Sequence, residues 1–254
     1  MADNGHLRSG LTTDGRARVL EVDVTPIARE IRARHALGPR ASHLAAEGAV
    51  ATALLSAHIK GAERITLQVQ SSTPEVAFIG DVDADGRLRG RLTPNTLPTP
   101  WSGTLDGALL AIKSIGRREL YRGVTPIEGV SLEAALRHHL SSSAQVKAGL
   151  TITVRSDPDG AITSATGTYV ERLPGAPAGP MDPTTLNELE KRALRWHCTC
   201  SQQRVESMLI AVGPDELRAM RVEDGGADVT CDFCLSVYHV DSPRLLELET
   251  AARG

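Results

Sequence analysis

Aromatic residues are scarce in this chain, at 3% of its 254 positions, so leucine, valine, isoleucine and alanine must build the core. No charge of either sign predominates: 28 basic and 31 acidic residues are well mixed, which argues against bulk electrostatic binding to nucleic acid or an anionic membrane. No apolar run approaches the roughly 18 residues that span a bilayer. The opening sequence MADNGHLRSG also lacks the apolar segment of a secretory signal. We therefore expect a cytoplasmic protein that does not contact membranes.

Cysteine is absent from the first 197 residues and then occurs four times, at Cys198, Cys200, Cys231 and Cys234. The pattern is C-x-C, thirty residues (201–230), then C-x-x-C. Thiols stay reduced in the cytoplasm, so clustered cysteines there indicate metal binding or redox chemistry rather than structural disulfides.

The residues before the cysteines predict an α+β domain over 1–171, because strands and helices alternate without a regular βαβ order. The clearest strand is 64–70, where apolar and polar residues alternate, and DADG at 83–86 predicts a hairpin turn. We expect a polar arm over 1–16, strands over 17–24, 64–70, 76–82, 87–92, 109–115, 120–127, 151–156 and 161–170, and helices over 25–37, 40–59 and 131–140.

Four prolines within 173–183 mark a domain boundary, since such a stretch continues neither a helix nor a central strand. We expect a short linker over 172–196 that ends in a helix at 184–196. A small, mainly helical C-terminal domain is then expected over 197–254. A short strand at 238–241 should precede its last helix.

The spacing of the cysteines favours zinc. Residues two apart in an extended chain point to one face, so Cys198 and Cys200 can aim at one centre, and Cys231 and Cys234 have the spacing of a turn-borne zinc pair. Four thiolates make a tetrahedral site that suits one Zn²⁺ per chain and leaves no position open for catalysis. An iron–sulfur cluster is an alternative occupant. The nearby His197 and His239 are expected to be bystanders, and Trp196 and Phe233 to pack around the site.

The tail from Cys198 to Gly254 is small enough to depend on such a crosslink for folding. Disulfides between neighbouring cysteines would close tiny loops, release the metal and leave the tail without its crosslink. Disulfides across the thirty-residue loop would instead keep the tail stapled. The first pairing would make a switch that unfolds on oxidation.

Two segments around the cysteines carry a family resemblance. CTCSQQRVESML (198–209) resembles the C-x-C-S-x-x-R-V segment of the 33-kilodalton heat-shock chaperone family of redox-regulated holdases, and CDFCLSVYHV (231–240) resembles its C-x-F-C-x-x-x-Y segment. Further likeness lies in KGAERITLQVQ (60–70), DADGRLRGRL (83–92) and YRGVTPIEG (121–129). The resemblance covers most of the chain.

The resemblance implies a chaperone that is not an enzyme. By position, Cys198, Cys200, Cys231 and Cys234 correspond to the zinc ligands of an inactive, reduced form. Oxidation combined with mild unfolding is implied to form the disulfides Cys198–Cys200 and Cys231–Cys234 and to release zinc. The activated protein, often a homodimer, would then hold unfolded or oxidatively damaged client proteins without ATP.

The segment before the cysteines departs from the family pattern. Only 22 residues (176–197) separate Gly175 from Cys198, whereas the family usually has a longer helical linker that senses unfolding. The shortened linker therefore predicts activation by oxidant alone, with less need for heat.

Two other function classes use paired cysteines. A zinc-ribbon nucleic-acid module should be basic, but residues 198–254 carry five arginines against ten acids, a balance that repels phosphate. A thiol–disulfide oxidoreductase built on CDFC should place that motif at a helix start. Here a strand-like YHVD and Pro243 follow it.

Overall fold

The computed structural model describes residues 4–143, 148–177 and 185–253. It divides into two compact units, unit 1 (Met1–His197) and unit 2 (Cys198–Gly254). Each unit has a hydrophobic core of its own. Among the described residues, no helix has both the length and the apolar character needed to cross a membrane.

Unit 1 is built on a ten-stranded sheet in the order β7-β6-β3-β4-β5-β10-β1-β2-β9-β8. Its strands are β1 (Gly5–Thr12), β2 (Ala17–Asp23), β3 (Glu63–Ser72), β4 (Glu75–Asp83), β5 (Arg87–Thr93), β6 (Leu105–Ile115), β7 (Arg118–Val130), β8 (Ala148–Ser156), β9 (Ile162–Arg172) and β10 (Leu186–Trp196). Neighbouring strands run antiparallel except β10 and β5, which share a short parallel ladder at Arg195 and Trp196. That short ladder joins two antiparallel groups of five strands.

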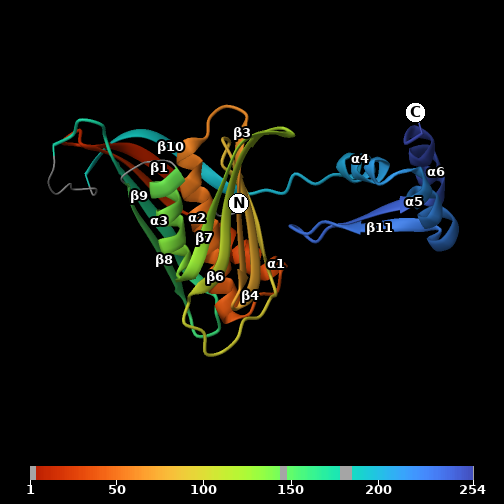
Figure 1. The fold of residues 1–254 in the computed structure, drawn as a ribbon, viewed down its shortest axis with the longest axis horizontal. Coiled ribbons are helices and arrows are strands. Elements are labelled where there is room, and N and C mark those ends of the chain that lie inside the picture. The colour runs from red at the N-terminus through yellow and green to blue at the C-terminus, as the bar shows by residue number, and fades with distance from the viewer. Residues whose placement is uncertain (1–3, 144–147, 178–184, 254) are drawn as a thin grey trace. The chain divides into compact units, whose positions relative to one another are not determined.

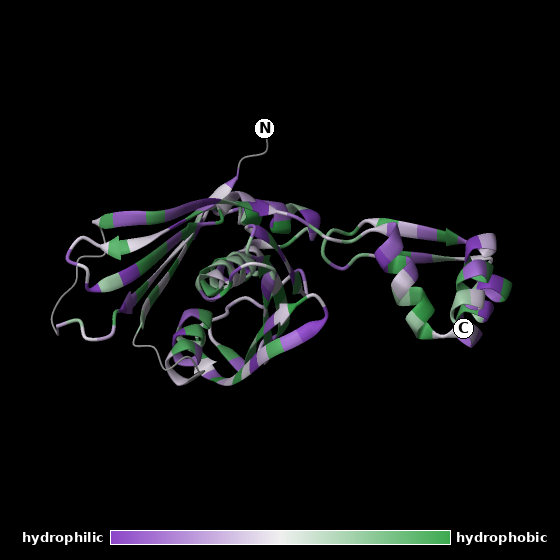
Figure 2. Cartoon of the chain, turned by 90° about the horizontal axis from the view of Figure 1, so that it is seen from above, coloured by the Kyte–Doolittle hydropathy of each residue, from purple (hydrophilic) through white to green (hydrophobic). Residues whose placement is uncertain are grey.

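The helices of unit 1 pack inside the curl of this sheet (Figures 1 and 2). They are α1 (Thr25–Arg34), α2 (Pro39–Leu55), the short 3₁₀ helix η1 (Ser56–His58) and α3 (Leu132–Ser143). Thirteen of the 17 residues of α2 are buried, so this alanine-rich helix is enclosed on almost every side. It contacts strands from both groups, including β4 and β5 on one side and β8 and β9 on the other.

The close approach of α2 to β4 depends on glycine. A Cβ at Gly48 of α2 would lie 2.6 Å from the ring of Phe78, and one at Gly80 of β4 would lie 2.3 Å from Thr52 Oγ1. Neither contact is sterically allowed, so both positions require the missing side chain. The helix can therefore lie directly against the middle of the sheet.

The expected α+β class is confirmed, and strands or helices form at the positions predicted between residues 17 and 171. Two predictions in unit 1 are wrong. The expected polar arm contains β1, and the described part of the helix expected over 184–196 is β10. These two strands pair with each other along their length, from Gly5 with Leu194 to Thr12 with Leu186. Residues 186–196 of the expected linker thus lie in the sheet; residues 178–184 are outside the described residues.

Unit 2 combines helices with a hairpin and is therefore not mainly helical, contrary to the prediction. Its elements are α4 (Gln202–Val212), α5 (Pro214–Ala219), the π-helical turn η2 (Met220–Asp224), β11 (Gly226–Thr230), β12 (Val237–Asp241) and α6 (Ser242–Ala251). Strands β11 and β12 pair antiparallel, and the CDFC motif lies in the turn between them. The predicted strand at 238–241 and the last helix are present as β12 and α6, and the sequence pattern did not predict β11.

A largely buried carboxyl on α2 predicts a pH-dependent stability for unit 1. Burial, followed by the nearby Glu133 carboxylate, raises the pKa of Glu47 to about 7. A raised carboxyl pKa means that the folded state holds the proton more tightly. The stability that the folded state gains from this tighter proton binding is fully present below the ordinary pKa near 4.5. It is lost as pH rises through about 7. Glu47→Gln should therefore raise stability at pH 8 by about 1 kcal/mol, because partial exposure of the side chain limits the effect.

Thermal unfolding of Glu47→Gln at pH 5 and pH 8 checks this expectation. The exposed Glu75→Gln is the matched control. Equal stabilisation of the two variants at pH 8 would contradict the role of Glu47.

Candidate metal centre

The first cysteine pair lies on an extended segment that is braced by the start of α4. Ser201 caps this helix by accepting a hydrogen bond from Arg204 N at 3.3 Å. The Arg204 guanidinium turns back and donates to Thr199 O at 3.1 Å and to Thr199 Oγ1 at 2.6 Å. Thr199 is thereby held on one side of the segment, and Cys198 and Cys200 point to the other. The Ser and Arg of the C-x-C-S-x-x-R pattern thus hold the first cysteine pair in position.

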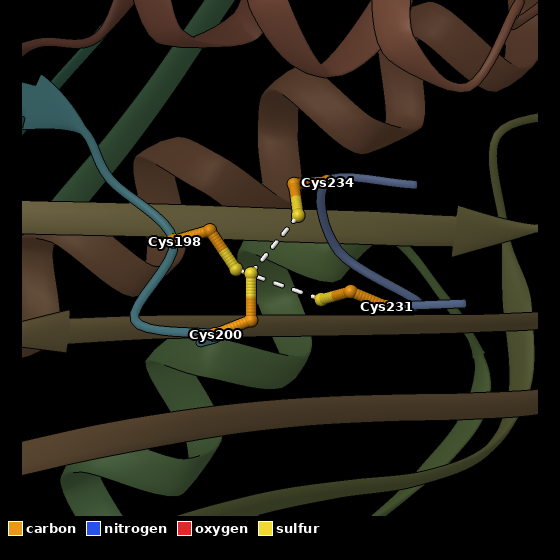
Figure 3. Close-up of side chains that lie close together, drawn as sticks. All are labelled: Cys198, Cys200, Cys231 and Cys234. Carbon is orange, nitrogen blue, oxygen red and sulfur yellow. Dashed lines mark hydrogen bonds between the residues drawn. The ribbon is translucent and has the colours of Figure 1, made fainter. Parts of the chain in front are cut away.

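The second pair lies in the turn of the β11–β12 hairpin. Cys231 N donates to Ser236 O at 2.9 Å, and Leu235 N donates to Cys231 O at 2.8 Å. Leu235 takes a left-handed conformation, with φ of 59°, which is unusual for a residue with a branched side chain. The turn directs the side chains of Cys231 and Cys234 to the same side, toward the other pair (Figure 3).

All four sulfurs converge. The Sγ atoms of Cys198, Cys200, Cys231 and Cys234 lie within 4.8 Å of one another. Cys198 Sγ is 3.6 Å from Cys231 Sγ, and Cys200 Sγ is 3.2 Å from Cys234 Sγ. With Zn–S bonds of about 2.3 Å, the sulfurs of a tetrahedral site would be about 3.8 Å apart. The sulfur positions are therefore close to those that a four-thiolate metal site requires.

The protonation of the four thiols is uneven. Burial raises the pKa of Cys234, but hydrogen bonds with Ser236 and the neighbouring thiols outweigh it and lower the pKa to about 6. Burial raises the pKa of Cys200 to about 12 and also raises that of Cys231. Without a cation the cluster therefore shares its protons, since adjacent thiolates repel one another. A divalent cation would offset that repulsion and allow the sulfurs to ionise together.

Two hydroxyl groups next to the sulfurs were not identified as functional from the sequence. Tyr238 Oη donates a hydrogen bond to Cys200 Sγ at 2.9 Å, and Ser236 Oγ lies 3.3 Å from Cys234 Sγ. The only signal in the sequence was their place in CDFCLSVY. Their contacts depend on how β12 pairs with β11, which the cysteine spacing does not specify.

The other residues expected near the cysteines are not members of the converging group. His239 Nδ1 is 2.7 Å from Asp228 Oδ1, and neither residue belongs to the converging group. Trp196 packs against the core of unit 1, with the Arg34 guanidinium 4.2 Å above its ring.

The core of unit 2 is small. Six apolar side chains are buried there besides Cys234: Val205, Leu209, Leu217, Val240, Leu245 and Leu248. A core of this size gives little stability alone, and structural metal sites commonly supply the rest in small domains. The cysteine cluster joins the segment before α4 to the β11–β12 turn. A metal bound there would therefore crosslink these two parts of unit 2.

Comparison with known proteins shows the family of this chain. The family model described as Hsp33 protein matches residues 5–188 and 179–241. The 33 kDa chaperonin of Oceanobacillus iheyensis is 28% identical over 96% of this chain and 99% of its own length. That of Bacillus subtilis is 26% identical over 92% and 94%. The crystal structure of the 33 kDa chaperonin from Thermotoga maritima has the same fold, with a TM-score of 0.80 at 20% identity over 97% of this chain and 98% of that one. The chain therefore belongs to the Hsp33 family of redox-regulated chaperones, which bind unfolded proteins and are not enzymes.

Proposed function

We propose that this protein is an ATP-independent holdase whose inactive, reduced form binds one Zn²⁺ through Cys198, Cys200, Cys231 and Cys234. The observation that carries the proposal is the convergence of four sulfurs from two segments thirty residues apart. Bound zinc supplies a crosslink between these segments. In this proposal residues 1–171 form the chaperone core, 172–196 connect it to the switch, and 197–254 form the switch.

Oxidation would remove that crosslink through two disulfides, Cys198–Cys200 and Cys231–Cys234. For each, two zinc-bound thiolates lose two electrons and form one S–S bond, and one peroxide molecule takes up these electrons with two protons from water and becomes two waters; Zn²⁺ leaves with its charge unchanged. Contacts across the loop also exist, at 3.6 Å between the Sγ atoms of Cys198 and Cys231 and at 3.2 Å between those of Cys200 and Cys234, because all four atoms surround one centre. Neighbours on one segment remain close after the segments separate, whereas pairs across the loop do not, and this favours the local disulfides.

Loss of the crosslink would loosen unit 2 and expose apolar surface for unfolded or oxidatively damaged clients. We further propose that the oxidised form is a homodimer. Side chains that are buried in the small core, such as Leu209 and Leu245, would become accessible when unit 2 opens. Surface of this kind binds other apolar chains without ATP.

The test measures zinc release and suppression of client aggregation together, before and after peroxide treatment with mild heat. We expect one zinc per chain in the reduced protein, and coincident zinc loss and gain of activity on oxidation. Peptide mapping should then find the two local disulfides. Full activity in the reduced, zinc-loaded protein, or mainly Cys198–Cys231 and Cys200–Cys234 links, would overturn the proposal.

Tyr238→Phe should make zinc release by peroxide faster. The lost hydrogen bond to Cys200 Sγ leaves more negative charge on that sulfur, which makes it more reactive toward peroxide. Loss of such a supporting contact typically weakens metal binding 10–100-fold. We therefore expect weaker zinc binding in chelator competition and faster zinc release by peroxide.

The matched control keeps the same chemistry away from the sulfurs. Tyr121→Phe removes a phenol hydroxyl from a half-exposed position on β7 in unit 1. Equal zinc affinity and release rate in the Tyr238→Phe and Tyr121→Phe proteins would show that the Tyr238 hydroxyl has no such role.

A further inference from the structure

A polar cavity of about 260 Å³ lies in unit 1, where the end of α2 meets β2 and β10. Three basic side chains line it: Arg18 from β2, Lys60 from the turn after η1, and Arg192 from β10. One carboxylate, Glu190, also lines it. The cavity is wholly within unit 1 and is unrelated to the cysteine cluster.

A buried hydroxyl in the wall of this cavity lacks a partner. Ser56, the residue after α2, lines the cavity and is only 2% exposed. Its Oγ is inaccessible and makes no hydrogen bond within the described part of the chain. A buried polar group without a partner costs about 1–3 kcal/mol and calls for an explanation. A ligand that accepts a hydrogen bond would remove this cost.

Two of the basic groups are also without partners. The side chains of Arg18 and Lys60 make no hydrogen bond or ion pair in residues 4–143, 148–177 and 185–253. Arg18 pairs across the sheet with Glu171, but the Glu171 carboxylate accepts a hydrogen bond from Tyr169 Oη at 3.3 Å. Both cations are therefore available to a ligand.

Arg192 is held in place and is partly neutralised. Its Nη1 donates to the carbonyl of Ala84, and its Nε lies 3.3 Å from Glu190 Oε1. The Nε atom is buried and makes no well-aligned hydrogen bond within the described chain. Among the lining residues, three cations against one carboxylate leave a formal charge of +2; the Glu171 and Glu63 carboxylates neighbour Arg18 and Lys60 outside the lining.

The helix dipole alone does not account for this arrangement. The C-terminus of α2, at Leu55, favours cations nearby, which explains part of the positive charge. It explains neither the unpaired hydroxyl of Ser56 nor the cavity that this residue lines. An anion with several acceptor oxygens explains both.

We propose that this cavity binds a tetrahedral oxyanion, with phosphate as the chemical class. The four oxygens of phosphate match four donor groups: the guanidinium groups of Arg18 and Arg192, the ammonium of Lys60 and the hydroxyl of Ser56. Guanidinium groups suit phosphate because their parallel N–H donors bind two oxygens at once. A bound phosphate would tie β10 to β2 and to the end of α2.

The experiment titrates the full-length, zinc-loaded, reduced protein with inorganic phosphate by calorimetry, at constant ionic strength set with chloride. Sulfate is the second arm, since it has the same shape. We expect saturable binding of both ions and none of chloride. Arg18→Gln should weaken phosphate binding at least tenfold. Arg117→Gln, an exposed arginine in the β6–β7 turn, is the control for the lost charge and should bind like the unaltered protein.

Ser56→Ala gives a second readout that a purely structural role would not produce. It should weaken phosphate binding several-fold while leaving the melting temperature in chloride unchanged or raised, because it removes an unpaired buried hydroxyl. Should Arg18→Gln fail to fold, Lys60→Gln at its exposed position serves the same comparison. Absence of saturable binding, or equal affinities in the cavity variants and Arg117→Gln, would overturn the proposal. The result is independent of zinc release, so it succeeds or fails separately from the proposed switch.

Discussion

Cys234→Ser should abolish stoichiometric zinc binding and unfold most of unit 2 while unit 1 stays folded. Structural zinc supplies about 10–16 kcal/mol in small domains, and the six buried apolar side chains of this unit cannot replace it. Cys234 is also the thiol with the lowered pKa, near 6, so its loss removes the sulfur that ionises most readily. We expect hydrogen exchange across α4 and α6 to rise to the rate of an unfolded chain.

Zinc content and hydrogen exchange, measured on the same sample, check this expectation. Thr230→Ser is the control, since it alters an exposed hydroxyl residue beside Cys231 and removes no sulfur. Treating the unaltered protein with a zinc chelator should reproduce the exchange pattern of Cys234→Ser. If Cys234→Ser kept one zinc per chain and native protection of α6, the four-sulfur site would be wrong.

Peroxide at low temperature should release zinc yet give little holdase activity. The sequence predicted the opposite, activation by oxidant alone, on the basis that residues 172–196 form a loose linker. The structure removes that basis for residues 186–196, because β10 pairs with β1 along its length and buries Leu194 completely. Losing the zinc crosslink in unit 2 breaks none of these contacts, so mild heat should still be needed to free β10.

Leu194→Ala should convert the protein to activation by oxidant alone. Truncating a fully buried leucine costs about 2–5 kcal/mol, and here the cost weakens the packing of β10. The control is Leu189→Ala on the same strand, where the side chain is 70% exposed. We expect peroxide at low temperature to raise aggregation suppression several-fold in Leu194→Ala and not in Leu189→Ala.

Hydrogen exchange of the β10 amides tests whether release of this strand is the step that activates the protein. It should stay slow after oxidation of the unaltered protein and become fast after oxidation of Leu194→Ala. Full activity of the unaltered protein in cold peroxide, with β10 still protected, would show that release of this strand is not required.

Local patterns were sufficient for most elements and insufficient for β1 and β10. The alternation in 64–70 and the turn residues of DADG predict β3, β4 and β5 directly. A half-buried strand requires apolar and polar residues to alternate, and this alternation is visible in the local sequence. The segment 184–196 consists largely of good helix formers, and of its described residues only Leu194 is buried. It is a strand because β1 has an open edge whose backbone groups require partners, and that requirement lies 180 residues away in the sequence.

The sequence by itself determined the four sulfurs, their two-by-two spacing and the α+β class, because the spacing of ligands and the period of apolar residues are local properties. Only the tertiary structure decided what surrounds them. The pairing of β12 with β11 positions Tyr238 beside Cys200, and the pairing of β10 with β1 makes the segment before Cys198 part of the sheet. Both are contacts between segments whose partners no local pattern specifies.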